Sequence, residues 1–123
     1  EVIEAALQMA EVDAESITMV EAHGTGTKIG DSIEVEALKR AFQTNKKAYC
    51  AIGSVKSSIG HLNEAAGIAG LIKTILSLTN KQIPPSLHVL NPNPKIEFEN
   101  TPFYINHSLR DWNQAATPRR AAV

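Results

Sequence analysis

The sequence predicts an α/β domain in which helices alternate with short buried strands. Three observations support this prediction: two short apolar runs, three segments with apolar residues at helical spacing, and a small-residue loop after each apolar run. The 123 residues are enough for one compact domain. Hydrophobic residues make up 43% of the chain and charged residues 20%, a balance typical of soluble globular proteins rather than of disordered chains.

The first half of the chain predicts a helix, a strand and a second helix. Residues 1–11 carry apolar side chains at helical spacing and predict an amphipathic helix. The run SITMVEA at residues 16–22 predicts a buried strand. A glycine loop follows and leads into a helix that we expect to end near residue 43. Asp31 and Glu34 have the spacing of a capping box, so we assign them to the start of this helix.

The next segment repeats the order of strand, small-residue loop and helix. AYCAIGS at residues 48–54 predicts a second strand, and VKSSIGH after it predicts a loop. Residues 62–78 predict a long helix that is apolar around most of its circumference and therefore central. Gly67 and Gly70 lie inside this helix, where each costs about 1 kcal/mol relative to alanine. We therefore expect another element to approach the helix closely.

The remaining tail is rich in proline and predicts extended, turn-rich chain. All six prolines lie between residues 84 and 118. Residues 103–105 predict one edge strand. Trp112 is expected to anchor the tail to the core, and His88 and His107 are expected to lie on the surface.

Charge and cysteine content exclude several classes of function. The net charge of −1 favours neither nucleic acid nor an anionic membrane as a partner. No apolar run is long enough to span a bilayer, and no N-terminal signal pattern is visible. The single cysteine, Cys50, cannot form an internal disulfide, which suits the reducing cytoplasm, and we expect it to be an inert core thiol. The four histidines and one cysteine show no metal-ligand spacing.

The loop VEAHGTGTKIGD holds the first group of candidate site residues. His23 follows the first predicted strand, and glycines after it allow a ligand to approach the backbone. Thr25 and Thr27 alternate, so both hydroxyls can line one side of an extended arm that carries amide groups. The segment lacks the lysine spacing of a phosphate-binding P-loop. A plain turn with a surface histidine is the alternative.

The second predicted strand is followed by the second group, Lys56 and His61. A helix N-terminus and a nearby ammonium both disfavour a charged imidazole, so His61 can donate a hydrogen bond as a neutral ring. A capping histidine with a solvated lysine is the alternative. Glu64 can pair with Lys56 or simply favour the helix dipole. Because sites in open α/β sheets gather at the carboxyl ends of strands, we expect His23 and His61 to lie close together.

Five segments together resemble the C-terminal half of a β-ketoacyl synthase: VEAHGTGTKIGDSIEVEAL, AIGSVKSSIGHLNEAAGIAGLIK, IPPSLH, NPNPKIEFENTPFYIN and PRRAAV. The ketosynthase domains of bacterial modular polyketide synthases are the most similar variety. The resemblance covers residues 1–123 and implies a thiolase-like fold of layered αβαβα architecture, incomplete in this chain. It implies that an N-terminal half with the nucleophilic cysteine, and a final glycine-rich strand segment, belong to a longer protein.

The resemblance also implies an activity, an acyl transfer by decarboxylative Claisen condensation in polyketide or fatty acid biosynthesis. His23 matches a histidine that binds the extender thioester and promotes its decarboxylation, and His61 matches one that donates to the enolate oxygen. Lys56 matches a lysine that supports and orients the site. Thr25 and Thr27 match hydroxyls that hold the amides of phosphopantetheine, the arm of the partner acyl carrier protein.

By the same resemblance, this half binds no cofactor of its own, and the complete protein that contains it (the parent) is expected to be a cytoplasmic homodimer. Cys50 is not the equivalent of the nucleophilic cysteine. Ser58 stands where asparagine is more usual, and Lys28 and Ile29 stand where proline and leucine are common. We expect these departures to be tolerated. We also expect the isolated chain to be inactive in condensation and marginally stable, because its strands lack partners.

Three alternatives to a catalytic ketosynthase remain. The first is a non-catalytic ketosynthase-like domain that binds carrier protein. The second is a nucleotide-binding module built on the glycine loop, which the missing P-loop lysine disfavours. The third is a related thiolase, which would use a different arrangement of histidine and cysteine.

Overall fold

The structure, a computed structural model, describes residues 1–114 and 117–123. The helices and strands of the described residues alternate as the sequence predicts. The α-helices are α1 (Val2–Met9), α2 (Gly30–Phe42), α3 (Lys56–Ile59) and α4 (Ala66–Asn80), and short 3-10 helices cover Ala14–Ser16, Asn63–Ala65 and Phe98–Asn100. The strands are β1 (Met19–Glu21), β2 (Cys50–Gly53), β3 (Gln82–Ile83), β4 (Phe103–Ile105), β5 (Arg110–Asp111) and β6 (Ala121–Ala122).

A parallel sheet of strand order β4-β2-β1-β6 forms the centre of the chain. Met19 of β1 lies opposite Ala51 of β2 on one side and opposite Ala121 of β6 on the other. Strands β3 and β5 form a separate antiparallel pair. Because β1 and β2 are both interior and parallel, the loops after them emerge at the same edge of the sheet.

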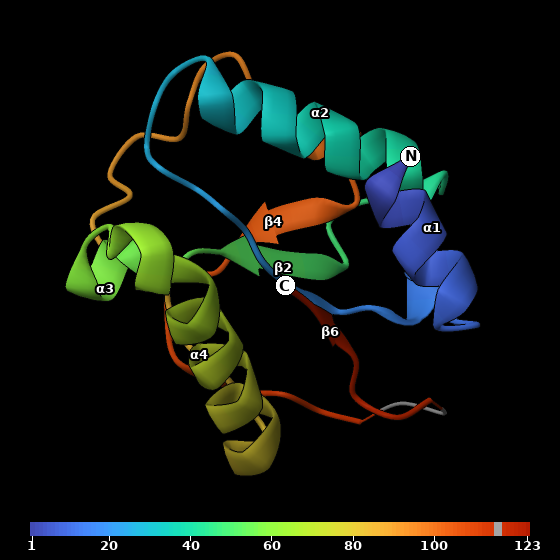
Figure 1. Cartoon of the computed structure of the whole chain (residues 1–123). Helices are drawn as coiled ribbons and strands as arrows, with labels where there is room; N and C mark the ends of the chain where they lie inside the picture. The colour runs from blue at the N-terminus through green and yellow to red at the C-terminus, as the bar shows by residue number, and fades with distance from the viewer. Residues whose placement is uncertain (115–116) are drawn as a thin grey trace.

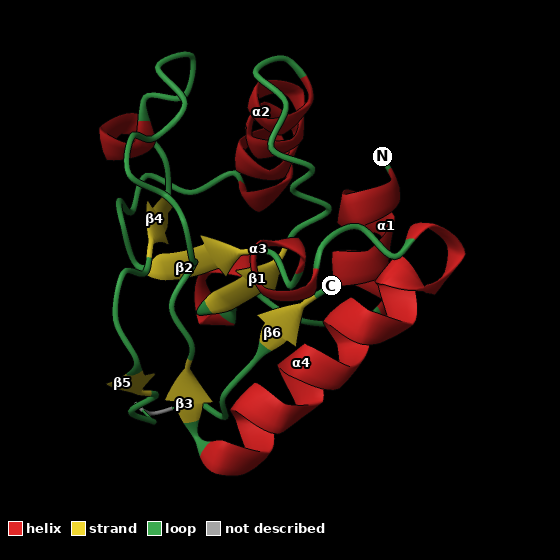
Figure 2. Cartoon of the chain, turned by 90° about the vertical axis from the view of Figure 1, so that its left-hand side faces the viewer, coloured by secondary structure: helices red, strands yellow, loops and turns green. Residues whose placement is uncertain are grey.

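Helices cover both faces of this sheet (Figures 1 and 2). Helices α1 and α2 lie on one face, and α4 lies on the other. Residues of β1 alternate between the two layers, so Val20 joins the core beneath α2 while Met19 joins a second core with Trp112. Burial on both faces explains why the first strand appears in the sequence as a continuous apolar run.

Helix α4 is more open than the sequence predicts. It begins at Ala66, after a 3-10 turn, and its buried residues are Ala66, Gly70, Thr74 and Ser77. The Thr74 and Ser77 hydroxyls donate to backbone carbonyls one turn earlier, which satisfies these buried groups against the sheet. Five of its large apolar residues are 42–56% exposed: Ile68, Leu71, Ile72, Ile75 and Leu76. The prediction that this helix is central is therefore wrong for this chain taken alone.

The two glycines of α4 differ in their surroundings. A Cβ built on Gly70 would lie 3.1 Å from Cγ of Glu21, so the expected close approach is confirmed at this position. A Cβ on Gly67 would meet no described atom within 4 Å, so the same expectation is wrong there. The Glu21 side chain of β1 occupies the space next to Gly70, and the absence of a Cβ at this position leaves room for it.

The tail follows the sequence prediction in part. Strand β4 is an edge strand, as predicted, and Trp112 is buried with its Nε1–H donating to Thr18 Oγ1 over 2.8 Å. His88 and His107 are exposed, as expected. The segment predicted as a loop after β2 instead forms the short helix α3. None of the described helices combines the length and hydropathy that crossing a membrane requires.

Candidate functional site

The two candidate histidines lie side by side. His23 follows β1, His61 follows α3, and their ring centroids are 5.5 Å apart with an edge-to-face angle of 85°. The parallel register brings them together, because the carboxyl ends of neighbouring strands meet at one edge of the sheet. Ser54 links the two loops, since its hydroxyl donates to the His23 carbonyl oxygen over 3.3 Å. Both rings are exposed and can reach a ligand.

Helix α2 holds the first loop through two carboxylates. Glu34 accepts from the backbone N–H of His23 at 2.6 Å and of Gly24 at 2.9 Å, and Asp31 accepts from Gly26 N–H at 3.2 Å. The predicted capping box is therefore wrong. Helix α2 begins at Gly30, and neither carboxylate binds an N–H group of the helix's own first turn in the described residues. Both acids instead fix the backbone on which His23 stands.

The two loop threonines face a common point, the α-carbon of Gly30. A Cβ at Gly30 would lie 2.5 Å from Thr27 Oγ1 and 3.8 Å from Thr25 Oγ1. Thr27 Oγ1 accepts from the Gly30 N–H at 3.1 Å and so caps α2, while its O–H remains able to donate. Both hydroxyls therefore lie near Gly30, and Thr27 has a structural contact that the sequence did not indicate.

The orientation of His61 follows from one backbone contact. Its Nδ1 accepts a hydrogen bond from the Asn63 N–H at 3.0 Å. A nitrogen that accepts carries no proton, so this contact assigns the proton of the neutral ring to Nε2. Gly60 turns the chain between α3 and His61 with φ of 78° and ψ of −178°, a conformation that is essentially restricted to glycine. His61 is therefore presented as a donor through Nε2.

Lys56 and Thr25 line one cavity of about 660 Å³ beside the histidines. Its walls come from the loop after β1, from α3 and from the tail, including Ser86 and Asn93. The rings of His23 and His61 are not part of the lining, so the structure groups four of the five predicted residues into a histidine pair and a neighbouring cavity, and Thr27 belongs to neither. Among the described residues Lys56 has no ion pair, with Glu64 or with any other carboxylate.

Two positioning contacts were missed by the sequence analysis. Glu21, at the end of β1, is buried and pairs with Lys73 of α4 over 2.6 Å. The signal was a single carboxylate inside an apolar run, two residues before His23. In the tail, Asn93 Nδ2 donates to the Lys28 carbonyl oxygen over 2.9 Å. No local pattern indicates this contact, because the two residues are far apart in the sequence.

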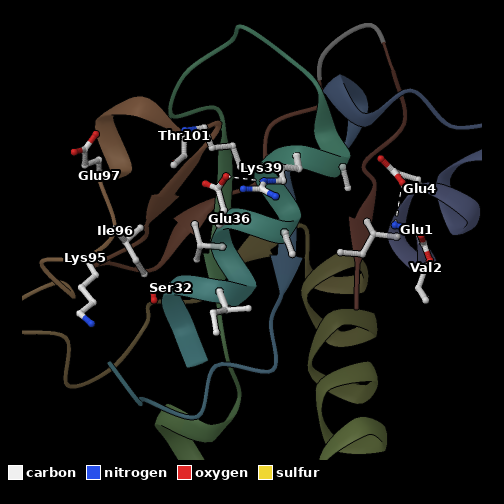
Figure 3. A pocket seen from close by; sticks show the side chains of 16 residues that line it. Glu1, Val2, Glu4, Ser32, Glu36, Lys39, Lys95, Ile96, Glu97 and Thr101 are labelled. Atoms are coloured by element: carbon white, nitrogen blue, oxygen red, sulfur yellow. Dashed lines mark hydrogen bonds and ion pairs between the residues drawn. The ribbon is translucent and has the colours of Figure 1, made fainter. Parts of the chain in front are cut away.

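A larger cavity of about 880 Å³ lies between α1, α2 and the tail (Figure 3). Its walls carry mixed charge, with Glu36 and Lys39 on α2 and Lys95 and Glu97 on the tail. None of the five predicted site residues lines it. It therefore has no part in the candidate chemistry.

Cys50 is a core residue, as predicted. Its side chain is 0% exposed, and burial raises the pKa of the thiol to about 12. A thiol of this kind holds its proton at neutral pH and is a poor nucleophile. Within residues 1–114 and 117–123 no group of three metal-ligating side chains stands together.

Comparison with known proteins decides the family. Residues 1–90 match the family model described as beta-ketoacyl synthase, C-terminal domain. The chain belongs to this family. As the resemblance predicts, the relatives of this β-ketoacyl synthase segment are polyketide synthases. It is 50% identical over 134 aligned residues to polyketide synthase PksM of Bacillus subtilis strain 168, with 100% of this chain covered.

Further relatives agree with this family. Over 126 aligned residues the chain is 47% identical to a subunit of the phenolphthiocerol/phthiocerol polyketide synthase of Mycobacterium tuberculosis. Among solved structures, the ketosynthase from module 6 of the bacillaene synthase of Bacillus subtilis 168 matches 94% of this chain with a TM-score of 0.89 and 50% identity. Ketosynthase twelve of the bacillaene polyketide synthase of Bacillus amyloliquefaciens matches 98% with a TM-score of 0.94 and 43% identity.

These matches confirm the predicted fold class, the C-terminal half of a thiolase-like fold. The chain spans only a small part of each relative: 3% of PksM, 8% of the mycobacterial protein, and 21–22% of the two solved ketosynthase chains. The family is that of a condensing transferase.

Proposed function

We propose that this chain is the decarboxylation half of a polyketide ketosynthase, with His23 and His61 as its catalytic pair. The observation that carries the proposal is the edge-to-face contact of the two rings at 5.5 Å, with Nε2 of His61 assigned as a donor. Two adjacent donors suit an oxygen that gains negative charge during a reaction, because donors aimed at developing charge act most strongly there.

The proposed reaction begins with a malonyl-type thioester. The bond between its α-carbon and its carboxylate breaks, CO2 leaves, and the electron pair moves onto the thioester as an enolate. The enolate oxygen accepts hydrogen bonds from His23 and from Nε2 of His61. The α-carbon then attacks the acyl thioester held on a cysteine of the parent, a carbon–carbon bond forms, and the cysteine thiolate leaves.

Lys56 and Thr25 serve the substrate in the neighbouring cavity. Both line it, and the Lys56 ammonium has no carboxylate partner in the described part of the chain, so its charge is available to support the site. The Thr25 hydroxyl can exchange hydrogen bonds with an amide of the phosphopantetheine arm. Thr27 can donate its O–H to the same arm while it accepts from Gly30. The partner that delivers this arm is an acyl carrier protein.

The exposed face of α4 supports a second partner, the N-terminal half of the same ketosynthase. Five large apolar side chains of α4 are open in this chain, and such a surface marks an interaction site. The missing half would cover it, which would make α4 the central helix that the sequence predicts. The nucleophilic cysteine would come from that half, since Cys50 is buried and its thiol is protonated.

The test is decarboxylation by the complete ketosynthase that contains this chain. His23→Ala and His61→Ala should each lower CO2 release from malonyl-carrier protein about 100-fold, since one lost donor costs about 3 kcal/mol. His107→Ala, in the exposed tail, is the matched control and should stay within twofold of the parent. A parent that binds carrier protein but releases no CO2 would instead favour the non-catalytic carrier-binding domain.

A further inference from the structure

Glu21 is the buried charge that the proposed reaction leaves unused. It ends β1, two residues before His23, and its side chain is 2% exposed. Its Oε2 pairs with Lys73 Nζ over 2.6 Å, and the Lys73 side chain is itself only 17% exposed. Its Oε1 accepts the backbone N–H of Val55 over 2.5 Å. Every oxygen of this carboxylate therefore has a partner from another segment.

These partners come from the segments that carry the rest of the site. Val55 directly precedes Lys56 and the short helix α3, and Lys73 belongs to α4, which follows His61. Gly70 leaves room for the contact, because a Cβ there would lie 3.1 Å from Cγ of Glu21. One carboxylate thus touches the loop after β2 and the helix after His61, and it shares a strand end with His23.

A buried ion pair of this kind does not by itself indicate that the pair stabilises the folded chain. Its desolvation cost offsets much of its attraction, and replacement by apolar residues of similar volume is often neutral for folding. The geometry points instead to a positioning role for the pair. We infer that Glu21 and Lys73 are positioning residues that fix the start of α3, and with it Lys56 and His61, relative to His23. This inference rests on the proposed function only for its catalytic readout.

Two double variants without the two charges, made in the complete ketosynthase, distinguish the loss of the hydrogen bond to Val55 from the loss of the charges. E21M/K73M keeps the volume of the pair but removes the acceptor for Val55 N–H. E21Q/K73Q also removes the charges, but its two amides can bond to each other while Oε1 of the new side chain still accepts from Val55. We expect E21M/K73M to lower kcat for decarboxylation at least tenfold, and E21Q/K73Q to stay within threefold of the parent. Equal rates in both variants would overturn the inference.

A third variant guards against failure of the double variants to fold. Val55→Pro removes the N–H and leaves Glu21 and Lys73 in place, and Val55 already has φ of −58°, which proline adopts. It should show the same loss of kcat with the ion pair intact, and a rate within twofold of the parent would overturn the inference. E36Q breaks the exposed pair with Arg40, in which the Arg40 and Glu36 side chains are 78% and 48% exposed, and serves as the control without effect.

Amide hydrogen exchange in residues 56–59 supplies a readout that does not depend on activity. In E21M/K73M these amides should exchange at least tenfold faster than in the parent and in E21Q/K73Q. If the parent releases no CO2 but this difference is seen, the proposed function fails while the positioning role stands. If the parent releases CO2 and exchange is the same in all variants, the positioning role fails alone.

Discussion

The two hydrogen bonds of Glu34 allow a quantitative prediction for the loop that carries His23. The carboxylate accepts from two consecutive N–H groups, at 2.6 Å from His23 and 2.9 Å from Gly24. Hydrogen bonds to a charged group contribute about 1.5–3 kcal/mol each, and neutral ones about 1 kcal/mol. In Glu34→Gln one oxygen becomes an NH2 group that cannot accept, so one bond is lost and the other becomes neutral.

The expected loss is about 2 kcal/mol of local stability, once solvent exposure of the His23 contact is taken into account. A loss of this size opens the loop about 30-fold more often. The amides of His23 and Gly24 should then exchange about 30-fold faster, as measured by amide hydrogen exchange in the complete ketosynthase. CO2 release should also fall, by up to the same factor, because only the closed loop holds the ring of His23 in place.

The matched control is Glu36→Gln, on the same helix but in an exposed pair with Arg40. It should change neither the exchange rate of the loop nor the rate of CO2 release. The reasoning would be refuted if Glu34→Gln folded normally with both rates within twofold of the parent. The loop would then be held by its glycine conformations and by Thr27 rather than by the carboxylate.

Two further predictions concern the core thiol and the tail. Burial raises the pKa of Cys50 to about 12, so the folded chain favours the protonated thiol. The contribution of this thiol to the free energy of unfolding is therefore fully present below the ordinary thiol pKa and is lost as pH rises toward 12. Cys50→Ala should flatten the fall of the melting temperature above about pH 9; an unchanged slope would count against it. Asn93→Ala removes the contact to the Lys28 carbonyl, worth about 1 kcal/mol, and should raise the KM for carrier-bound extender about fivefold. A KM equal to that of the parent would show that the loop does not need this tail contact.

Local patterns in the sequence predicted the parts of the fold that local forces determine. Buried parallel strands need continuous apolar residues, so β1 and β2 could be predicted from their apolar runs. Helix α2 could be predicted from the helical spacing of its apolar residues. The strand β6 covers only Ala121–Ala122 and forms because β1 offers an open edge. Helix α3 has four residues, which is too short for a periodic pattern.

The candidate site likewise has a part that local patterns predict and a part that only the folded chain shows. His23 and His61 could be paired from the sequence, because parallel strands bring their carboxyl ends to one edge. The roles of Glu34 and Glu21 could not. Glu34 has the spacing of a helix cap, but two loop N–H groups compete for its carboxylate. The partner of Glu21 lies 52 positions away, so only the folded chain brings Lys73 to it.

The anchoring of Trp112 bears on the design of hybrid synthases. Its indole N–H reaches Thr18 at the entrance to β1, its backbone N–H donates to the Lys81 carbonyl oxygen, and its own carbonyl oxygen accepts from Arg119. Farther along the tail, β6 pairs with β1 itself. A splice between two synthases placed inside residues 84–112 would therefore join one parent's first strand to another parent's anchoring tail. Splices that keep Thr18, Trp112 and β6 from a single parent should yield the better-folded hybrids.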